Sequence, residues 1–534
     1  MTEAFDPVDL EIVRNQLEGV ATEMGRTLIR GAYSPNIKER RDASTAIFDP
    51  EGRLVAQAEH IPVHLGALPD AVAAVREHGP APGDVFLLND PFAGGTHLPD
   101  VTLVAPLAPD GDTLGYGAVR AHHADVGGAT PGSLPAGARD VYAEGIRVPP
   151  VAIRRRGQLR EDVLGVLLAN VRHPRTRRAD LHAQLGAIER GEVRLGELAA
   201  EHGRARLAAG FEAVRRYSRR RTTAAIGGLA DGTYRAVDAL EGDGRTDDPV
   251  EIQVAVTVDG DAVHVDFDGT DDQVDGNVNA PPAVAKSAVY FVVRCVTGAD
   301  IPPNAGCFDP VTVEIPHGSV LHPRPPAAVG GGNVETSQRV ADVVLEAFRG
   351  AEPTLPAHGQ GTMNNLLIGP RGHDETYYET IGGGFGARPD KDGIDGVHVG
   401  MTNTRNTPVE TLEQAFPLTV LRYGLRPTSG GDGRHRGGLG IERTVRVEVP
   451  SAVSILSDRR RRGPPGAAGG AAGATGVNEV GGERVGSKVS LEVAAGTVVR
   501  LLTPGGGGFG DPAERDPERR DRDVRDGKVD PETG

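Results

Sequence analysis

Residues 84–125 read DVFLLNDPFAGGTHLPDVTLVAPLAPDGDTLGYGAVRAHHAD, and this stretch decides the fold of the first part of the chain. Three apolar runs, VFLL, VTLVAPL and GYGAVRA, alternate with the loops NDPFAGGTHLPD and APDGDTLG. Short apolar runs bounded by Gly, Pro, Asn and Asp are typical of strands, and loops on a rigid sheet often carry function. The stretch therefore predicts a β-sheet with long functional loops.

The last two runs predict a hairpin. If its turn is centred near Gly111, residues 101–108 pair with residues 114–121 in antiparallel register. That register places two pairs of polar residues opposite each other, namely Asp100 with His122 and His97 with Asp125.

This pairing turns a sequence separation into a spatial cluster. Opposed residues of an antiparallel pair have Cβ atoms about 5 Å apart, near enough for both side chains to bind one ion. Imidazole and carboxylate groups suit Zn²⁺, Mn²⁺ or Fe²⁺, and Gly94 and Gly95 would let the backbone bend toward such an ion. From the residues alone, a buried polar network that only satisfies hydrogen bonds is an equal alternative.

The residues before this stretch predict a helix, a hairpin and a short helix. Asp6 and Pro7 form a cap and first turn, and apolar residues at helical spacing follow as far as Gly31. Residues 45–49 and 54–58 flank a turn-forming Pro50-Glu51-Gly52, which indicates a hairpin. A short helix is expected over residues 69–78.

The residues after it change pattern more than once. Two or three helices are expected between residues 161 and 226, followed by a hairpin of residues 252–258 and 263–267, whose apolar positions alternate. A helix is expected over residues 335–348, and strands with glycine-rich loops follow. The charged tail is expected to lie on the surface.

The expected fold is a loop-rich, mixed α+β protein in three regions. Residues 1–225 form a metal-site region with a helical segment, residues 226–350 a β-rich region with a following helix, and residues 351–534 a glycine-rich β/α C-terminal region.

Charge and composition exclude several classes of protein. With 58 Lys and Arg against 74 Asp and Glu, the net charge is −16, which opposes nucleic acids and anionic membranes. No run of eighteen apolar residues and no secretory signal pattern is present, so a soluble cytoplasmic protein is expected. Two cysteines in 534 residues suit a reducing compartment.

Other motifs give weaker signals. The strings GGGFG at 382–386 and PGGGGFG at 504–510 lack the Lys-Ser/Thr of a phosphate-binding P-loop, so backbone packing or turns are the favoured interpretation. The basic run Arg459–Arg462 could bind an anion but is more typical of a solvated edge. The sequence contains no G-x-S-x-G motif and therefore gives no sign of covalent catalysis through a nucleophilic serine.

Several long strings, in order along nearly the whole chain, resemble the hydantoinase B/5-oxoprolinase family. They are NIKERRDAS, VHLGALPDAV, NDPFAGGTHLPDVTLVAP, RAHHADVGG, PGSLPAG, GGGNVETSQRVADVV, GQGTMNN, MTNTRNTPVE and TPGGGGFGDP. This family includes N-methylhydantoinase B subunits, one half of 5-oxoprolinase, and subunits of acetone and acetophenone carboxylases.

The resemblance implies a metal site and a partner. It implies that His97, Asp100 and His122 bind a divalent metal (Zn, Mn or Fe), with Asp42 as fourth ligand. His123 and Asp125 would then orient ligands or handle protons, as catalytic groups beside the metal. An A-type subunit would bind ATP and phosphorylate the substrate carbonyl, which implies a hetero-oligomer.

The function that this resemblance implies is the opening of a small cyclic amide, such as a hydantoin, 5-oxoproline or a related lactam. A ketone carboxylase subunit is the alternative within the same family. A non-catalytic scaffold, whose histidines are structural, is a third possibility.

Overall fold

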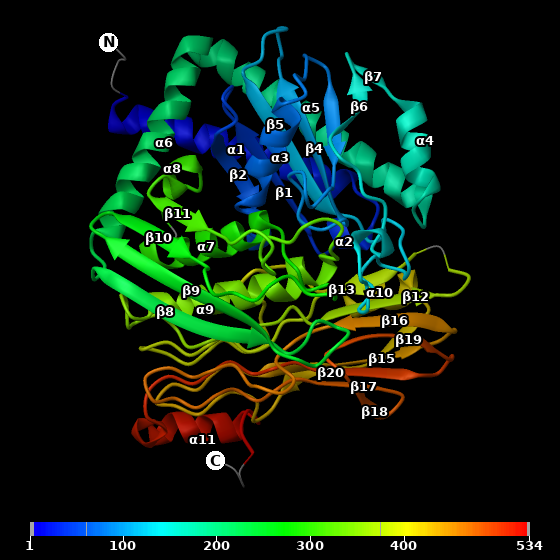
Figure 1. Ribbon diagram of the computed structural model, residues 1–534, viewed down its shortest axis with the longest axis vertical. Helices are drawn as coiled ribbons and strands as arrows, with labels where there is room; N and C mark the ends of the chain where they lie inside the picture. The colour runs from blue at the N-terminus through cyan, green and yellow to red at the C-terminus, as the bar shows by residue number, and fades with distance from the viewer. Residues whose placement is uncertain (1–4, 60, 299, 374, 531–534) are drawn as a thin grey trace.

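In the computed structural model, which describes residues 5–59, 61–298, 300–373 and 375–530, the strands form four sheets, and long helices pack against two of them (Figure 1). The expected α+β class is confirmed. Among the described residues, no helix is long and apolar enough to cross a membrane.

The N-terminal part is built on a seven-stranded sheet with strand order β2-β1-β5-β4-β3-β6-β7. Both predicted hairpins lie side by side in it, because β1 pairs with β2 and also with β5. Its strands are β1 (Ala43–Phe48), β2 (Leu54–Glu59), β3 (Val85–Leu88), β4 (Asp100–Leu107), β5 (Gly115–His122), β6 (Val151–Arg155) and β7 (Gln158–Leu159).

Helices cover both faces of this sheet, which explains why β4 is buried along its whole length. The apolar stripe of the first helix, including Leu17 and Met24, packs with the later helices on one face, and Leu68 and Val72 pack on the other. The predicted Asp6 cap is confirmed, since its side chain accepts hydrogen bonds from the N–H groups of Val8 and Asp9. The helices are α1 (Pro7–Gly31), α2 (Pro35–Lys38), α3 (Ala67–Arg76), α4 (Glu161–Ala169), α5 (Pro174–His202) and α6 (Arg204–Ile226).

The middle part is a four-stranded sheet with helices packed on it. The predicted hairpin is confirmed, and Val258 pairs with Val263 beside its turn. A π-helical turn, Gly332–Thr336, leads into the predicted helix, which begins at Ser337. The elements are β8 (Gly232–Leu240), β9 (Val250–Asp259), β10 (Ala262–Asp266), β11 (Val311–Glu314), α7 (Pro282–Thr297), α8 (Ala305–Phe308) and α9 (Ser337–Phe348).

The C-terminal part contains two sheets that share one apolar core, to which Ile455 and Val445 belong (Figure 1). The first has the order β13-β12-β16-β19 and the second β14-β15-β20-β17-β18. The elements are β12 (Asn365–Pro370), β13 (Tyr377–Glu379), α10 (Val409–Ala415), β14 (Leu418–Arg426), β15 (Gly440–Val447), β16 (Ser451–Leu456), β17 (Val477–Val480), β18 (Glu483–Val485), β19 (Lys488–Val493) and β20 (Val498–Leu502).

The charged tail lies largely on the surface, as expected. It forms the helix α11 (Pro517–Arg525), and Asp523 in that helix is buried. The Asp523 carboxylate pairs with Arg436 and Arg515, so an ion-pair cluster fixes α11 to the preceding loops.

Glycine-rich segments pack backbone against backbone beside the C-terminal sheets, in an arrangement that we call the glycine layer (residues 382–387, 430–440, 463–474 and 504–510). Gly506 donates its N–H to Gly438 O at 2.9 Å, and Gly431 donates to Gly506 O at 2.9 Å. A Cβ added at Gly437 would lie 1.9 Å from Gly506 O. These glycines serve close backbone packing, which confirms the favoured interpretation of the two glycine strings.

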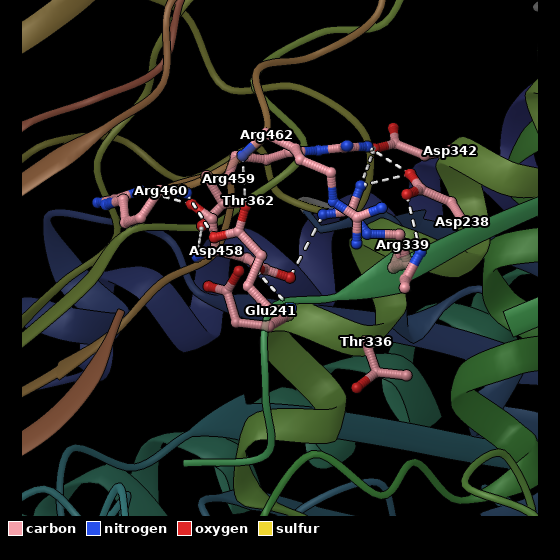
Figure 2. A network of polar contacts seen from close by, with 12 residues as sticks. Asp238, Glu241, Thr336, Arg339, Asp342, Thr362, Asp458, Arg459, Arg460 and Arg462 are labelled. Carbon is pink, nitrogen blue, oxygen red and sulfur yellow. Dashed lines mark hydrogen bonds and ion pairs between the residues drawn. The ribbon is translucent and has the colours of Figure 1, made fainter. Parts of the chain in front are cut away.

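A buried network of ion pairs joins the middle sheet to the C-terminal part (Figure 2). The Arg339 side chain, which is fully buried, lies 2.8 Å from Asp238 and 3.3 Å from Asp458. Arg459, which is 3% exposed, lies 2.7 Å from Asp238 and 2.9 Å from Asp342. The prediction of a solvated edge was therefore wrong for Arg459, because three carboxylates from distant segments surround these two arginines.

Arg460 also departs from the predicted solvated edge, because it is only partly exposed and its side chain donates hydrogen bonds to Asn478 and Asn364, each at 2.8 Å. Glu241, directly after β8, accepts hydrogen bonds from the N–H groups of Arg460, Arg461 and Arg462 at 2.6, 2.8 and 2.7 Å (Figure 2). The side chains of Arg461 and Arg462 are exposed, as predicted for this run.

Candidate metal centre

The β4–β5 hairpin has the predicted register. Asp100 pairs with His122, and the pairing continues in step to Leu107 and Gly115. The second predicted pair is not formed: among the described strands, the pairing of β4 with β5 ends at Asp100 and His122. His97, in the loop before β4, turns toward Asp100 instead.

Three side chains meet at the open end of this hairpin. His97 Nε2 lies 3.2 Å from Asp100 Oδ1, His122 Nδ1 lies 3.3 Å from the same oxygen, and the two ring nitrogens lie 3.2 Å apart. All three side chains are buried, and their ligand atoms form a group that could hold a metal ion. We call this group the three-residue cluster.

The geometry of the three-residue cluster fits a small divalent ion. Ligand atoms at ~2.1 Å from one tetrahedral ion lie ~3.4 Å apart, close to the separations observed here. Asp100 Oδ1 makes no hydrogen bond among the described residues, although two ring nitrogens lie near it. A buried, unpaired carboxylate oxygen is costly, and an ion between the three atoms would satisfy it.

The other oxygen of Asp100 is held by neighbours. Asp100 Oδ2 accepts a hydrogen bond from Thr96 Oγ1 at 2.6 Å and from Asn333 Nδ2 at 3.4 Å, and His64 Nε2 lies 3.5 Å away. His64 Nδ1 is itself 2.9 Å from Ser44 Oγ. Such contacts fix the orientation of a ligand carboxylate.

The histidines also control the charge of this carboxylate. Burial would raise the pKa of Asp100, but its close contacts with His97, His122 and His64 outweigh burial and hold the pKa well below its usual range. Asp100 is therefore ionised at neutral pH, which is the state that binds a cation.

The three-residue cluster faces a small cavity of about 20 Å³, enough for one ion or one water molecule. Segments from all three parts of the chain line it. The lining residues are Asp42, Ile61, Val63, His64, His97, Asp100, His122, Asn333, Val334, Met363, Tyr378, Thr380, Thr402 and Thr404.

A family model described as hydantoinase B/oxoprolinase matches residues 6–512. The chain belongs to the hydantoinase B/oxoprolinase family. The 5-oxoprolinase 1 of Arabidopsis thaliana is 41% identical over 541 residues, which cover 95% of this chain and 42% of that relative. The chain thus spans less than half the length of that relative.

Two solved structures have closely similar folds. The ATP-dependent caprolactamase from Pseudomonas jessenii has a TM-score of 0.92 and 29% identity, covering 99% of this chain and 95% of that chain. Acetone carboxylase in its nucleotide-free structure has a TM-score of 0.91 and 19% identity, covering 99% of this chain and 78% of that chain. At that lower identity, the likeness to acetone carboxylase shows the fold alone.

The strings that resemble the hydantoinase B/oxoprolinase family come together at the cavity. KERRDAS contributes Asp42, the two histidine strings contribute the three-residue cluster, and GGGNVETSQ contributes Asn333 and Val334. GQGTMNN and MTNTRNTP contribute Met363, Thr402 and Thr404. Strings separated by hundreds of residues thus form one site.

Asp42 lines the cavity beside the three-residue cluster without belonging to its tightest group. Arg41 has a positive φ of 58°, an uncommon conformation that turns the chain just before Asp42. The Asp42 carbonyl accepts a hydrogen bond from the His122 N–H at 3.1 Å. Burial lowers the pKa of His122, and the Asp42 charge acts against this shift.

His123 and Asp125 lie on the other side of the hairpin and line a separate, mostly apolar cavity. His123 Nε2 is 2.9 Å from Gln184 Oε1, and burial with the charge of Arg177 lowers the pKa of His123 to about 4. The Asp125 carboxylate accepts hydrogen bonds from the N–H groups of Gly127, Gly132 and Arg172. Asp125 therefore holds the backbone around the site and His123 contacts the Gln184 side chain, and neither belongs to the three-residue cluster.

Sequence reasoning missed several residues of the site. His64 and Tyr378 lie against the three-residue cluster but belong to no metal-ligand spacing. The only feature of the sequence that pointed to either residue was the position of His64 in the family string VHLGALPDAV. Tyr378, in β13, needs the docking of the C-terminal sheet to reach the site.

Proposed function

We propose that this chain is the metal-containing B-type subunit of an ATP-dependent cyclic amide hydrolase. The observation that carries the proposal is the three-residue cluster, whose geometry fits Zn²⁺, Mn²⁺ or Fe²⁺. The similarity to caprolactamase, at 29% identity over 99% of the chain, supports a cyclic amide as substrate.

In this proposal His97, Asp100 and His122 hold the ion, and Asp42 completes the ligand set. When bound, the ion neutralises developing negative charge and lowers the pKa of water. Thr96 and Asn333 keep the Asp100 carboxylate in one orientation. Proton handling by His123 or Asp125 stays a prediction, and their contacts favour a positioning task.

The proposed partner is an A-type subunit that binds ATP and phosphorylates the carbonyl oxygen of the amide. Amide resonance makes attack by water slow, and phosphorylation of the carbonyl oxygen makes the carbonyl carbon a better electrophile. The cavity of about 20 Å³ is too small for a cyclic amide, so substrate entry requires an opening that we assign to contact with the partner. Such a hetero-oligomer would also shield the phosphorylated intermediate from bulk water.

The proposed location is the cytoplasm, where ATP is available to the partner. The two cysteines, Cys295 and Cys307, are free thiols, as expected in a reducing compartment.

Elemental analysis of the purified chain, beside a folded His97→Ala, His122→Ala double variant, tests the proposed centre. Near-stoichiometric Zn, Mn or Fe in the parent and its loss from the variant are expected. Cyclic amides are then screened with ATP and the A-type partner, and ring opening should occur together with ADP release. A parent that stays metal-free after reconstitution, yet supports full activity in the complex, would overturn the metal proposal in favour of a scaffold.

The screen also separates the hydrolase from a ketone carboxylase. A carboxylase would consume ATP with a ketone only in the presence of bicarbonate, and it would form a carbon–carbon bond. ATP turnover that requires bicarbonate and leaves all cyclic amides intact would replace the hydrolase proposal.

A further inference from the structure

Glu335 lies directly behind the wall of the metal-site cavity. It belongs to the π-helical turn Gly332–Thr336, and turns of this kind are frequent at functional sites. Asn333 and Val334 of the same turn line the cavity, whereas the side chain of Glu335 is fully buried. The π-helical turn therefore joins the cavity wall to an interior carboxylate.

One oxygen of this carboxylate holds a neighbouring segment. Glu335 Oε1 accepts hydrogen bonds from the Met363 N–H at 3.2 Å and from Asn365 Nδ2 at 3.0 Å. Glu335 Oε2 has no hydrogen-bond partner among the described residues. All direct hydrogen bonding therefore passes through one oxygen.

Asn365 transmits this contact to Tyr378. Its Nδ2 also donates to Leu456 O at 3.0 Å, and its Oδ1 accepts the Tyr378 hydroxyl at 3.0 Å. Rotating the amide by half a turn would place the oxygen against two acceptors and the nitrogen against the hydroxyl. Glu335 thus fixes the orientation of Asn365, which in turn fixes the Tyr378 hydroxyl.

The Tyr378 ring stacks on a member of the three-residue cluster. Its centroid lies 4.7 Å from that of the His122 ring, at an interplanar angle of 16°. A histidine that binds a metal usually donates its other N–H to an acceptor, which sets the plane of the ring. His122 Nε2 has no such acceptor among the described residues. The stacked phenol ring of Tyr378 is therefore the contact that sets the plane of the His122 ring.

We propose that Glu335 is a positioning residue which, through Asn365, holds Tyr378 against the His122 imidazole and so sets how tightly the three-residue cluster binds its ion. The inference rests on the proposed metal centre and adds to it two residues, Glu335 and Asn365, that do not line the cavity.

The surroundings of Glu335 determine which substitution imitates it best. Burial and the charge of Asp458 raise the pKa of Glu335 to about 7, although the nearby Thr362 and the charges of Lys488 and Arg460 act against this shift. A neutral side chain is thus well populated near neutral pH. In a Glu335→Gln variant the amide oxygen can keep the acceptor role of Oε1, and the amide NH2 then takes the position of the unpartnered Oε2.

The test measures the affinity of Co²⁺ by competition with a chromophoric chelator, together with the visible absorption of the Co²⁺ complex. Glu335→Leu should bind Co²⁺ about tenfold more weakly and shift the absorption bands, as expected for loss of an outer contact. Glu335→Gln should stay within about twofold of the parent. Tyr378→Phe should reproduce the loss, and the double variant Glu335→Leu, Tyr378→Phe should bind no more weakly than either single variant.

Glu241→Leu is the matched control, because it also removes a buried carboxylate held by backbone N–H groups. It should lower the melting temperature and leave Co²⁺ binding unchanged. An equal loss in Glu241→Leu, or parent-like binding by both Glu335→Leu and Tyr378→Phe, would overturn the inference alone. If Glu335→Leu does not fold, Tyr378→Phe decides. A parent that binds no ion would overturn the metal centre itself.

Discussion

Asp100 and His122 are cross-strand partners at the open end of one hairpin, and Asp100 Oδ1 lies 3.3 Å from His122 Nδ1. Because β4 and β5 fix both backbones, the two side chains are presented to one point. A site prepared in this way loses little conformational freedom when it binds.

Replacing Asp100 by Asn should abolish stabilisation by metal, because the amide lacks the negative charge that attracts the ion. At an ion concentration about 100 times the dissociation constant, the parent should gain about 2.7 kcal/mol of stability. Thermal unfolding with and without Zn²⁺ or Mn²⁺ measures this gain. Asp112→Asn, at the exposed tip of the same hairpin, is the control and should respond like the parent. An equal rise in melting temperature for Asp100→Asn would speak against its role as a ligand.

The two adjacent histidines should differ in their effect on metal content. His122→Gln should lose the ion, because His122 faces the cavity, whereas His123→Gln should retain it, because His123 contacts Gln184 instead. Elemental analysis of the two purified variants makes the comparison. If both variants lose the ion equally, the assignment of His122 as a ligand and of His123 as a non-ligand is wrong. Retained metal with a lower kcat in His123→Gln would support the predicted proton-handling role.

Stability should fall between about pH 6.5 and pH 9 through His358. Burial lowers the pKa of His358, but its contacts with the Asp342 and Glu346 carboxylates, at 3.8 and 2.8 Å, outweigh burial and raise the pKa to about 9. Since the folded pKa lies above the unfolded one, the contribution is complete below the unfolded pKa and is lost as pH rises through the folded one. The loss should be roughly 3 kcal/mol.

Denaturant unfolding at several pH values measures this dependence. His358→Gln should be less stable than the parent at pH 6, and the difference should vanish toward pH 9.5. His78→Gln, at an exposed position, is the control. A constant difference between parent and His358→Gln across this range would contradict the assignment.

Gly437→Ala should destabilise the protein by about 3 kcal/mol or more, because the new Cβ would lie 1.9 Å from Gly506 O. Gly424→Ala is the matched control, since a Cβ there meets no atom of the described residues within 4 Å. Its effect should stay within about 1 kcal/mol. Chemical denaturation of both variants provides the comparison, and similar midpoints would show that the glycine layer can relax around a methyl group.

The sequence predicted those features that depend on local pattern. The β4–β5 register followed from the position of one turn, because a shift by one residue would move every apolar side chain to the other face. That register alone brought Asp100 and His122 together. The fold class and the first helix followed from periodicity and capping in the same way.

Features that depend on docking between distant segments could not be predicted. Arg459 looked like part of a solvated run, and only the approach of Asp238 and Asp342 from the middle part explains its burial. Tyr378 reaches His122 only because the C-terminal sheet packs against the hairpin. His97 does not pair with Asp125 because the loop before β4 bends away from the line of the strand. The alternation of apolar and polar residues gives no information about such a bend.

The glycine layer should respond to temperature differently from the helix-covered sheets. Exposing apolar surface raises the heat capacity of unfolding, whereas exposing polar backbone lowers it. The glycine layer is held largely by peptide hydrogen bonds, such as that from Gly506 to Gly438, and buries few large apolar side chains. Cooling weakens the hydrophobic cores, but it leaves those peptide contacts largely intact. Near the freezing point, the glycine layer should therefore be among the last parts of the molecule to come apart.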